Sequence, residues 1–132
     1  MLPADALTVA ARLFAAIEAG DLETIHELYA PQVVIWHAHD GGSQGREENL
    51  RTLALARAAI DGLRYEEVRR HATERGFVQQ HVLRGTARLT GLPLELPAAI
   101  VCTVEEGRIV RLDEYFDRAP LRVLTPASDR AT

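Results

Sequence analysis

The amino-acid sequence predicts an α+β domain: a cone-like, curved antiparallel or mixed sheet that wraps around a pocket and is covered by about three N-terminal helices. Two patterns favour this class. In the first half, apolar residues recur at helical spacing over residues 4–19 and 46–59. In the second half, runs of strand-forming residues are separated by short polar turns. A group of helices followed by a group of strands is typical of a helical layer that covers one face of a sheet.

The three helices are predicted from their spacing and caps. Residues 4–19 place apolar side chains on one face, and Gly20 ends this helix as a C-terminal cap. Asp21 is expected to cap a second, short helix. Pro31 is expected to end it, because proline cannot continue the hydrogen-bond ladder. The third helix is predicted over residues 46–59.

The strands are expected around and after the third helix. Residues 33–39 are β-branched and aromatic, hence a strand, and the glycine-rich residues 40–45 form a loop. Four long strands follow at residues 63–73, 77–86, 92–104 and 108–117. We expect one domain over residues 1–119 and a frayed C-terminal tail over residues 120–132.

Composition excludes several classes of function. The chain has 132 residues, 47% of them hydrophobic, and a formal net charge of -4, which disfavours nucleic-acid binding. Lysine is absent, which excludes Schiff-base chemistry. The single cysteine, Cys102, excludes an internal disulfide and a thiolate zinc site. No segment resembles a signal peptide or a membrane span, so we expect a cytoplasmic protein that binds no membrane.

Glu114 is the most informative residue for function. In the strand expected at residues 108–117, Val110, Leu112 and Phe116 share its face, because alternate residues of a strand point the same way. If this face points into the core, burial raises the pKa of Glu114, as suits a general acid or base. The alternative is that the sheet frays here and Glu114 is in solvent.

The order of elements and three segments resemble the nuclear-transport-factor-2-like superfamily, and within it the SnoaL-like group. The segments are residues 14–21 (FAAIEAGD), 28–30 (LYA) and 107–117 (GRIVRLDEYFD). The resemblance extends from Leu7 to Asp117 and implies the cone-like fold described above. The superfamily includes ketosteroid isomerases, polyketide cyclases, limonene-epoxide hydrolases and binding modules, so the fold alone does not choose a function.

The ketosteroid isomerase pattern is largely absent. The position of their catalytic Asp corresponds to His37, that of their oxyanion-binding Tyr to Phe14, and that of their protonated Asp to Val101. The chain therefore lacks both the hydroxyl and the carboxyl donor. The resemblance thus argues against authentic steroid isomerisation.

The limonene-epoxide hydrolases are more similar at the end of the chain. Their acid/base Asp corresponds to Glu114, their Arg and second Asp to Gln79 and His81, and their water-binding Asn to His37. The positions are polar, but the Asp-Arg-Asp triad is absent. SnoaL-like cyclases move a proton with a pocket acid or base, which Glu114 or His37 would supply here.

Residue by residue, we expect Glu114, His37 and His81 to be catalytic. His37 is either a base or hydrogen-bond donor, or a buried histidine bonded to a carbonyl. His81 lies either in the pocket or on an exposed sheet face, and in the pocket it would bond Glu114. The substrate-binding residues are expected to be Gln79, Phe14, Phe116, Leu112, Ile35 and His39.

No metal and no cofactor are expected. Imidazole and carboxylate groups bind zinc or iron, and His37, His39, Asp40 and His81 are the available ligands. However, His37 and His39 are the only close pair on one strand face, and no helical His-x-x-x-His motif is present. The sequence also contains no phosphate loop, dinucleotide fingerprint or Ser-His-Asp pattern.

The opposite strand faces predict a partner. Trp36 and Tyr115 point away from the pocket, and Arg111 is placed to pair with Asp113. Tyrosine and arginine are enriched at interfaces, so we expect a homodimer through the outer face of the sheet.

These observations favour a cofactor-independent acid/base enzyme acting on a small apolar molecule with a carbonyl or epoxide oxygen. The reaction would be an isomerisation, a cyclisation or a hydrolysis. The alternatives are a non-catalytic small-molecule-binding module and a dimeric interaction domain of the same fold.

Overall fold

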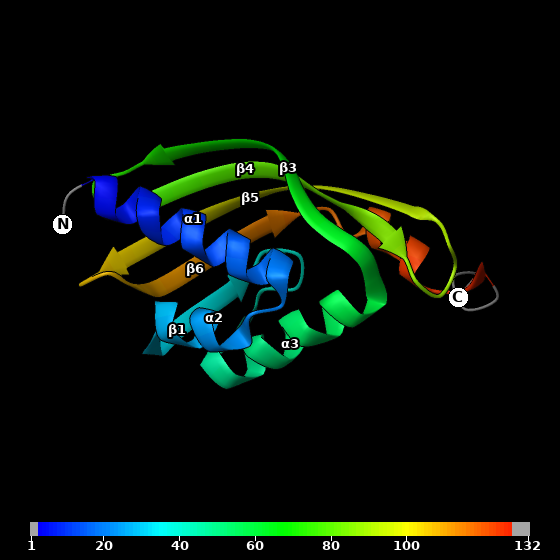
Figure 1. Cartoon of the computed structure of the whole chain (residues 1–132), viewed down its shortest axis with the longest axis horizontal. Coiled ribbons are helices and arrows are strands. Elements are labelled where there is room, and N and C mark those ends of the chain that lie inside the picture. The colour runs from blue at the N-terminus through cyan, green and yellow to red at the C-terminus, as the bar shows by residue number, and fades with distance from the viewer. Residues whose placement is uncertain (1–2, 128–132) are drawn as a thin grey trace.

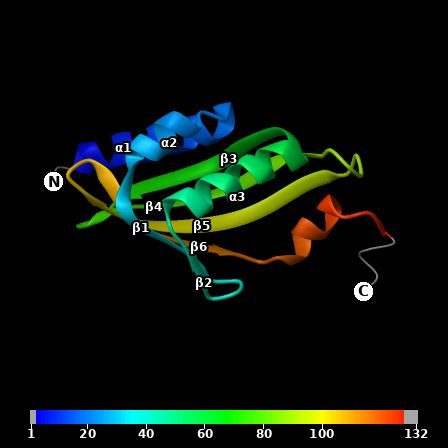
Figure 2. The same ribbon diagram turned by 90° about the horizontal axis from the view of Figure 1, so that it is seen from below.

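The helices lie on one face of a curved sheet (Figures 1 and 2). The computed structural model describes residues 3–127. Its helices are α1 (Pro3–Ala19), α2 (Leu22–Leu28), α3 (Arg46–Ala59) and the 3₁₀ helix η1 (Ala119–Leu124). Its strands are β1 (Tyr29–His37), β2 (Gly42–Gln44), β3 (Ile60–Ala72), β4 (Gly76–Ala87), β5 (Pro93–Glu105) and β6 (Arg108–Phe116). The predicted α+β class, with N-terminal helices over a mixed sheet, is confirmed.

Within residues 3–127, the strands form one open sheet in the order β2-β1-β6-β5-β4-β3. β1 and β6 run parallel, and the other neighbouring strands run antiparallel. β3 changes register twice against β4, and Glu67, at the second change, has a left-handed backbone with φ 54°. Such bulges bend and twist a strand. Figure 1 shows β3 curving from the end of α3 toward α1.

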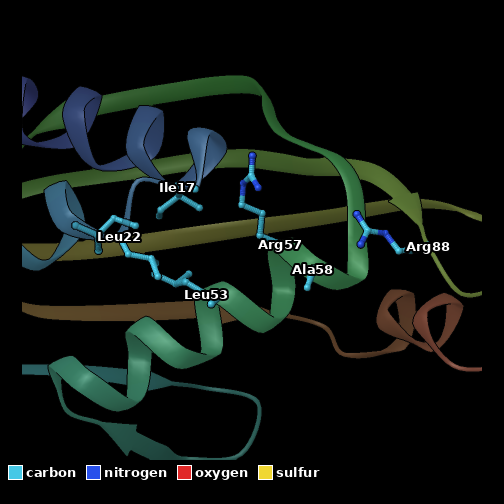
Figure 3. A pocket seen from close by; sticks show the side chains of 9 residues that line it. Ile17, Leu22, Leu53, Arg57, Ala58 and Arg88 are labelled. Carbon is cyan, nitrogen blue, oxygen red and sulfur yellow. The ribbon is translucent and has the colours of Figure 1, made fainter.

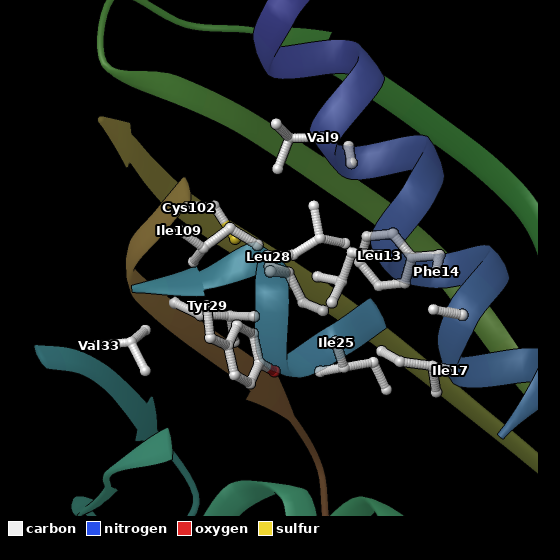
Figure 4. Packing of buried hydrophobic residues seen from close by; sticks show 14 of the residues in the cluster. Val9, Leu13, Phe14, Ile17, Ile25, Leu28, Tyr29, Val33, Cys102 and Ile109 are labelled. Carbon is white, nitrogen blue, oxygen red and sulfur yellow. The ribbon is translucent and has the colours of Figure 1, made fainter. Parts of the chain in front are cut away.

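The main core lies where α1 and α2 meet the concave face of the sheet (Figure 4). The stripe predicted for residues 4–19 is buried there, and the capping contact predicted for Asp21 is present, since its carboxylate accepts the Thr24 N–H at 3.1 Å. Full burial of one large apolar side chain contributes about 1.5–3 kcal/mol. The buried side chains of this layer are Val9, Leu13, Phe14, Ile17, Ile25, Leu28, Tyr29, Cys102 and Ile109.

Pro31 does not end the second helix, contrary to the prediction. The helix ends at Leu28, and Tyr29 already has an extended backbone at the start of β1. Pro31 lies inside β1, where the pairing with β6 changes register between Tyr29 and Val34. Proline is tolerated at such an irregularity because no regular ladder bond is required of it.

Val110 is not on the face of Glu114, which corrects a second prediction. Ile109 is buried in the core, whereas Val110 is only partly buried and borders an outer hollow with Arg108 and Thr103. The cause is a register shift between Thr103 and Val104 of β5, where it pairs with β6. One extra residue in a strand inverts the alternation of faces beyond it.

The segment after β6 is ordered as far as it is described. η1 places Leu121, Val123 and Leu124 against a second apolar cluster that includes Leu94 and Leu96. Fraying expected from small and polar residues is therefore wrong for residues 120–124, and residues 128–132 lie outside the described chain. The loop expected at residues 40–45 contains the short strand β2.

No helix among the described residues is long and apolar enough to cross a membrane.

Candidate active site

An apolar cavity of about 360 Å³ lies between the helices and the concave face of the sheet. Its walls include Phe14 and Ile17 of α1, Leu53 of α3, and Leu112 and Phe116 of β6. Clefts of this size, mostly apolar with a few polar groups, are typical of small-molecule sites. The polar groups of this cavity therefore define what it can do chemically.

Glu114 and His37 form an ion pair on the cavity wall. They are register partners on the parallel strands β6 and β1, and Glu114 Oε1 lies 3.4 Å from His37 Nε2. Their side chains are 26% and 12% exposed, respectively. The hydrogen bond to Glu114 raises the pKa of His37, although burial acts in the opposite direction. The carboxylate thus favours the imidazolium form of its neighbour.

His39, just beyond β1, presents a buried atom without a partner. Its Nδ1 has no hydrogen bond within residues 3–127, while its Nε2 lies 3.5 Å from Asp40 Oδ2. The centroid of the His39 ring lies 4.7 Å from that of Phe116 and 5.6 Å from that of His37, with the ring planes tilted by 37° and 59°, respectively. An unsatisfied buried polar atom costs about 1–3 kcal/mol. A ligand in the cavity would remove this cost by bonding Nδ1.

Gln79 and His81 lie behind the cavity wall in a short hydrogen-bond chain. Arg70 Nε donates to Gln79 Oε1 at 2.6 Å, and Gln79 Nε2 lies 2.9 Å from His81 Nδ1. Because arginine can only donate, the amide nitrogen of Gln79 faces His81, whose Nδ1 must accept. The His81 proton is therefore on Nε2.

His81 is held in its neutral form. Burial lowers the pKa of His81 to about 4, helped by the Arg70 charge and opposed by Glu114. Its ring packs against Tyr65 at 4.6 Å and Phe14 at 5.5 Å, both of which line the cavity. The predicted hydrogen bond between His81 and Glu114 is not among the contacts of the described residues, in which Glu114 pairs with His37.

Tyr65 is a polar group of the wall that sequence reasoning missed. Its ring lies edge-on to Phe14 at 5.0 Å, and its hydroxyl makes no hydrogen bond within residues 3–127. Burial raises the pKa of Tyr65, and the charges of Glu114 and Glu18 act in the same direction. The group is therefore a neutral donor that faces a cavity without a protein acceptor. The alternation of Leu63 and Tyr65 on one strand face was the signal that could have found it.

A second missed feature is a polar network that joins β1, β2 and α3. Tyr29 donates to Asn49 Oδ1 at 2.8 Å, Asn49 Nδ2 to Gln44 Oε1 at 2.9 Å, and Gln44 Nε2 to Thr52 Oγ1 at 2.9 Å. All four side chains line the cavity. The network holds the β2 turn and α3 in place as one wall of the site.

The cavity brings together most of the predicted site residues. It is lined by Glu114, His37, His39, Phe14, Phe116, Leu112 and Ile35, whereas Gln79 and His81 lie behind it. No three His, Cys, Asp or Glu side chains of the described chain converge into a metal-binding group.

A sequence model of the SnoaL-like domain matches residues 10–112, which is most of the chain. The chain belongs to the SnoaL-like family. A search of curated protein sequences finds no match to it. The known proteins that this chain is similar to are therefore given by the SnoaL-like domain model and by solved structures.

Solved structures share this SnoaL-like fold. IdmH, a proposed polyketide cyclase from Streptomyces antibioticus, is 27% identical with a TM-score of 0.78, covering 91% of this chain and 95% of that one. AclR, a proposed hydroxylase from Streptomyces galilaeus, is 16% identical with a TM-score of 0.82, covering 92% and 96%. An LEH-like epoxide hydrolase of M. tuberculosis is 15% identical with a TM-score of 0.71, covering 86% and 84%. The fold thus hosts several chemistries.

In this SnoaL-like chain, the wall combines a carboxylate, a basic imidazole and a neutral phenol. By its chemistry, the Glu114 carboxylate is able to accept a proton, a protonated His37 to donate one, and the Tyr65 hydroxyl to donate a hydrogen bond. Such a set can remove a proton and stabilise the negative charge that develops on an oxygen.

Proposed function

We propose that this protein is a cofactor-independent acid/base enzyme that acts on a small apolar molecule with a carbonyl or epoxide oxygen. The observation that carries the proposal is the His37–Glu114 pair, with 3.4 Å between Nε2 and Oε1, on the wall of an apolar cavity. An acid and a base on one wall can serve the two ends of a proton transfer.

In the proposed mechanism, the Glu114 carboxylate takes a proton from a carbon beside the carbonyl, or from water that opens an epoxide. The His37 imidazolium delivers a proton to the oxygen that gains negative charge. The Tyr65 hydroxyl donates a hydrogen bond to this oxygen and lowers the cost of the charge. The apolar walls exclude water from the reaction.

The reaction class we propose is isomerisation, cyclisation or hydrolysis, with cyclisation to be assayed first. IdmH supports this order, because at 27% identity it is a proposed polyketide cyclase. Epoxide hydrolysis by an Asp-Arg-Asp triad receives less support, since Gln79 and His81 occupy two of the corresponding positions behind the wall.

The test is a substrate panel of linear polyketide analogues, enones and epoxides, followed by the pH dependence of kcat/KM. Glu114→Gln and His37→Gln are each expected to lower kcat by about 10²–10⁴, the usual contribution of a general acid or base. Glu105→Gln and His26→Gln are the matched controls, because both residues are exposed outside the cavity. Unchanged turnover in Glu114→Gln would refute the proposed acid/base mechanism.

A non-catalytic binding module is the second candidate, favoured by the predominance of apolar groups in the wall. Apolar ligands would then raise the melting temperature without turnover. The stabilisation would persist in Glu114→Gln. A cavity that no ligand of the panel enters would instead favour a dimeric interaction domain.

A further inference from the structure

We propose that the ligand of this cavity carries an anionic group, which Arg57 binds at an entrance between α1, α2 and α3. The proposal rests on the proposed function only in taking the cavity as the ligand site. It adds a chemical class: an amphiphilic molecule with an apolar body and a carboxylate or phosphate at one end.

A cleft of about 290 Å³ opens between the three helices, and Arg57 and Arg88 are its charged residues (Figure 3). Its apolar side is formed by Leu22, Ile17 and Leu53. Ile17 and Leu53 also line the 360 Å³ cavity. The cleft and the cavity therefore adjoin at two shared wall residues.

A second hollow that Arg57 lines also adjoins the cavity. Arg88 lines it as well, together with the carboxylates of Glu18 and Asp61 and the apolar side chains of Ile60 and Leu63. Both of these apolar residues also belong to the wall of the cavity. Arg57 thus lines two surface hollows, each of which adjoins the cavity through a pair of apolar side chains.

Arg57 is the cation of this entrance without a carboxylate partner. Arg88 donates from Nη2 to Asp61 Oδ1 at 2.7 Å, and the Glu18 carboxylate accepts the backbone N–H of Tyr65 at 2.9 Å. Within residues 3–127, Arg57 has no ion pair or hydrogen bond. Its donors are free to bind an anion that arrives from solvent.

Because Gly20 has no side chain, the Arg57 side chain can pack directly against its backbone. A Cβ atom at Gly20 would lie 2.5 Å from Arg57 Nε and 2.8 Å from Cζ. Figure 3 shows the Arg57 side chain extending from α3 toward the end of α1, beside Ile17. The guanidinium is thereby directed over the entrance, where the apolar body of a ligand would pass Ile17 and Leu53.

The test compares two ligands of equal chain length, octanoate and 1-octanol, by calorimetry and by methyl NMR. We expect both to shift the methyl signals of Ile17, Leu53 and Leu112. In Arg57→Gln, the ratio of octanoate to octanol affinity should fall about fivefold, as for loss of one partly exposed charge pair. Arg57→Lys should keep most of the ratio.

The matched control is Arg51→Gln, which removes an exposed arginine of α3 outside the cleft and should leave the ratio unchanged. If Arg57 has a purely structural role, Arg57→Gln will change the melting temperature and leave the ratio of octanoate to octanol affinity unchanged. That result would overturn the proposal. Loss of the ratio in Arg88→Gln but not in Arg57→Gln would also overturn it.

The outcomes separate this inference from the proposed function. If both ligands bind and the ratio does not depend on Arg57, the anion site is wrong and the acid/base proposal stands. If neither ligand binds, the assignment of the cavity as the ligand site fails, and this inference fails with it.

Discussion

His37 and Glu114 show how two residues acquire their chemistry from register. Their strands run parallel, and pairing at this position brings imidazole and carboxylate within 3.4 Å. The contact raises the pKa of His37 against the effect of burial. A histidine with a pKa above 6.5 is more protonated at neutral pH than a free one, as an acid in the site requires.

We predict that the NMR titration of His37 moves to lower pH in Glu114→Gln, because burial, which lowers the pKa of His37, is then opposed only by the charge of Asp40, the smallest of the causes that raise it. The control is Glu47→Gln, which removes a carboxylate 3.4 Å from the exposed His26 and should not move the His37 titration. The stabilising effect of the pair is fully present below pH 6.5 and is lost as pH rises through the raised pKa. A His37 titration that is the same in both variants would contradict the prediction.

His81 gives the opposite pH dependence. Its pKa is lowered to about 4, so it stays neutral when folded, while the unfolded chain takes up a proton below pH 6.5. Folding stability should therefore fall between pH 6.5 and 4, by roughly 3 kcal/mol for this residue. Urea unfolding of wild type and His81→Gln over this range measures it. The prediction is wrong if the two proteins lose stability in parallel.

At the scale of elements, local patterns predicted most of the helices and strands but not the bulges. The helix at Arg46–Ala59 matches its prediction, since its periodicity is a local property. The burial of Ile109 in place of Val110 depends on a register shift against β5, which alternation within one strand does not contain. Pro31 inside β1 has the same kind of cause, a shift against β6.

The site was also predictable where it depends on the alternation of side chains within one strand, and not where it depends on packing between elements. Glu114 and His37 follow from alternation on their own strands, and both line the cavity. Gln79 and His81 also point inward, but whether they reach the cavity depends on what covers them. The rings of Phe14 and Tyr65 pack against His81, and that packing depends on where α1 lies over β3 and β4. Helix placement is a tertiary property that no single segment encodes.

Gly76, at the start of β4, has no room for a Cβ atom beside the backbone of β5. A Cβ atom there would lie 2.1 Å from the carbonyl oxygen of Cys102, a backbone atom held by the sheet. We predict that Gly76→Ala lowers the free energy of unfolding by about 1–3 kcal/mol, as overpacking does. Gly45→Ala is the control, because its Cβ would meet nothing within 4 Å. Urea unfolding measures both, and equal stability of the two variants would contradict the argument.

At the scale of the whole molecule, the helices cover one face of the sheet and leave the other open (Figure 2). On the open face, Val68, Val101 and Tyr115 are 42%, 42% and 44% exposed. Trp36 packs edge-on against Tyr115 at 5.6 Å, and Arg111 pairs with Asp113 at 2.9 Å, as predicted. Exposed apolar side chains on a face that no helix covers make that face a candidate interface.

We propose that a second copy of the chain covers this face. The exposed edge beside Val68 carries both signs of charge, Glu67 and Arg69, so a copy related by two-fold symmetry can place opposite charges together. We predict a homodimer in analytical ultracentrifugation and a monomer for Val101→Arg, which puts a charge on this face. Leu89→Arg is the control, since Leu89 is 71% exposed in the turn between β4 and β5 and should leave the dimer intact. A wild-type protein that sediments as a monomer at micromolar concentration would show that this face has no such partner. The cavity lies on the other face of the sheet and should keep its ligand affinity in Val101→Arg. The reason is that, among the described residues, no side chain lines both the hollow beside Val68 and the cavity.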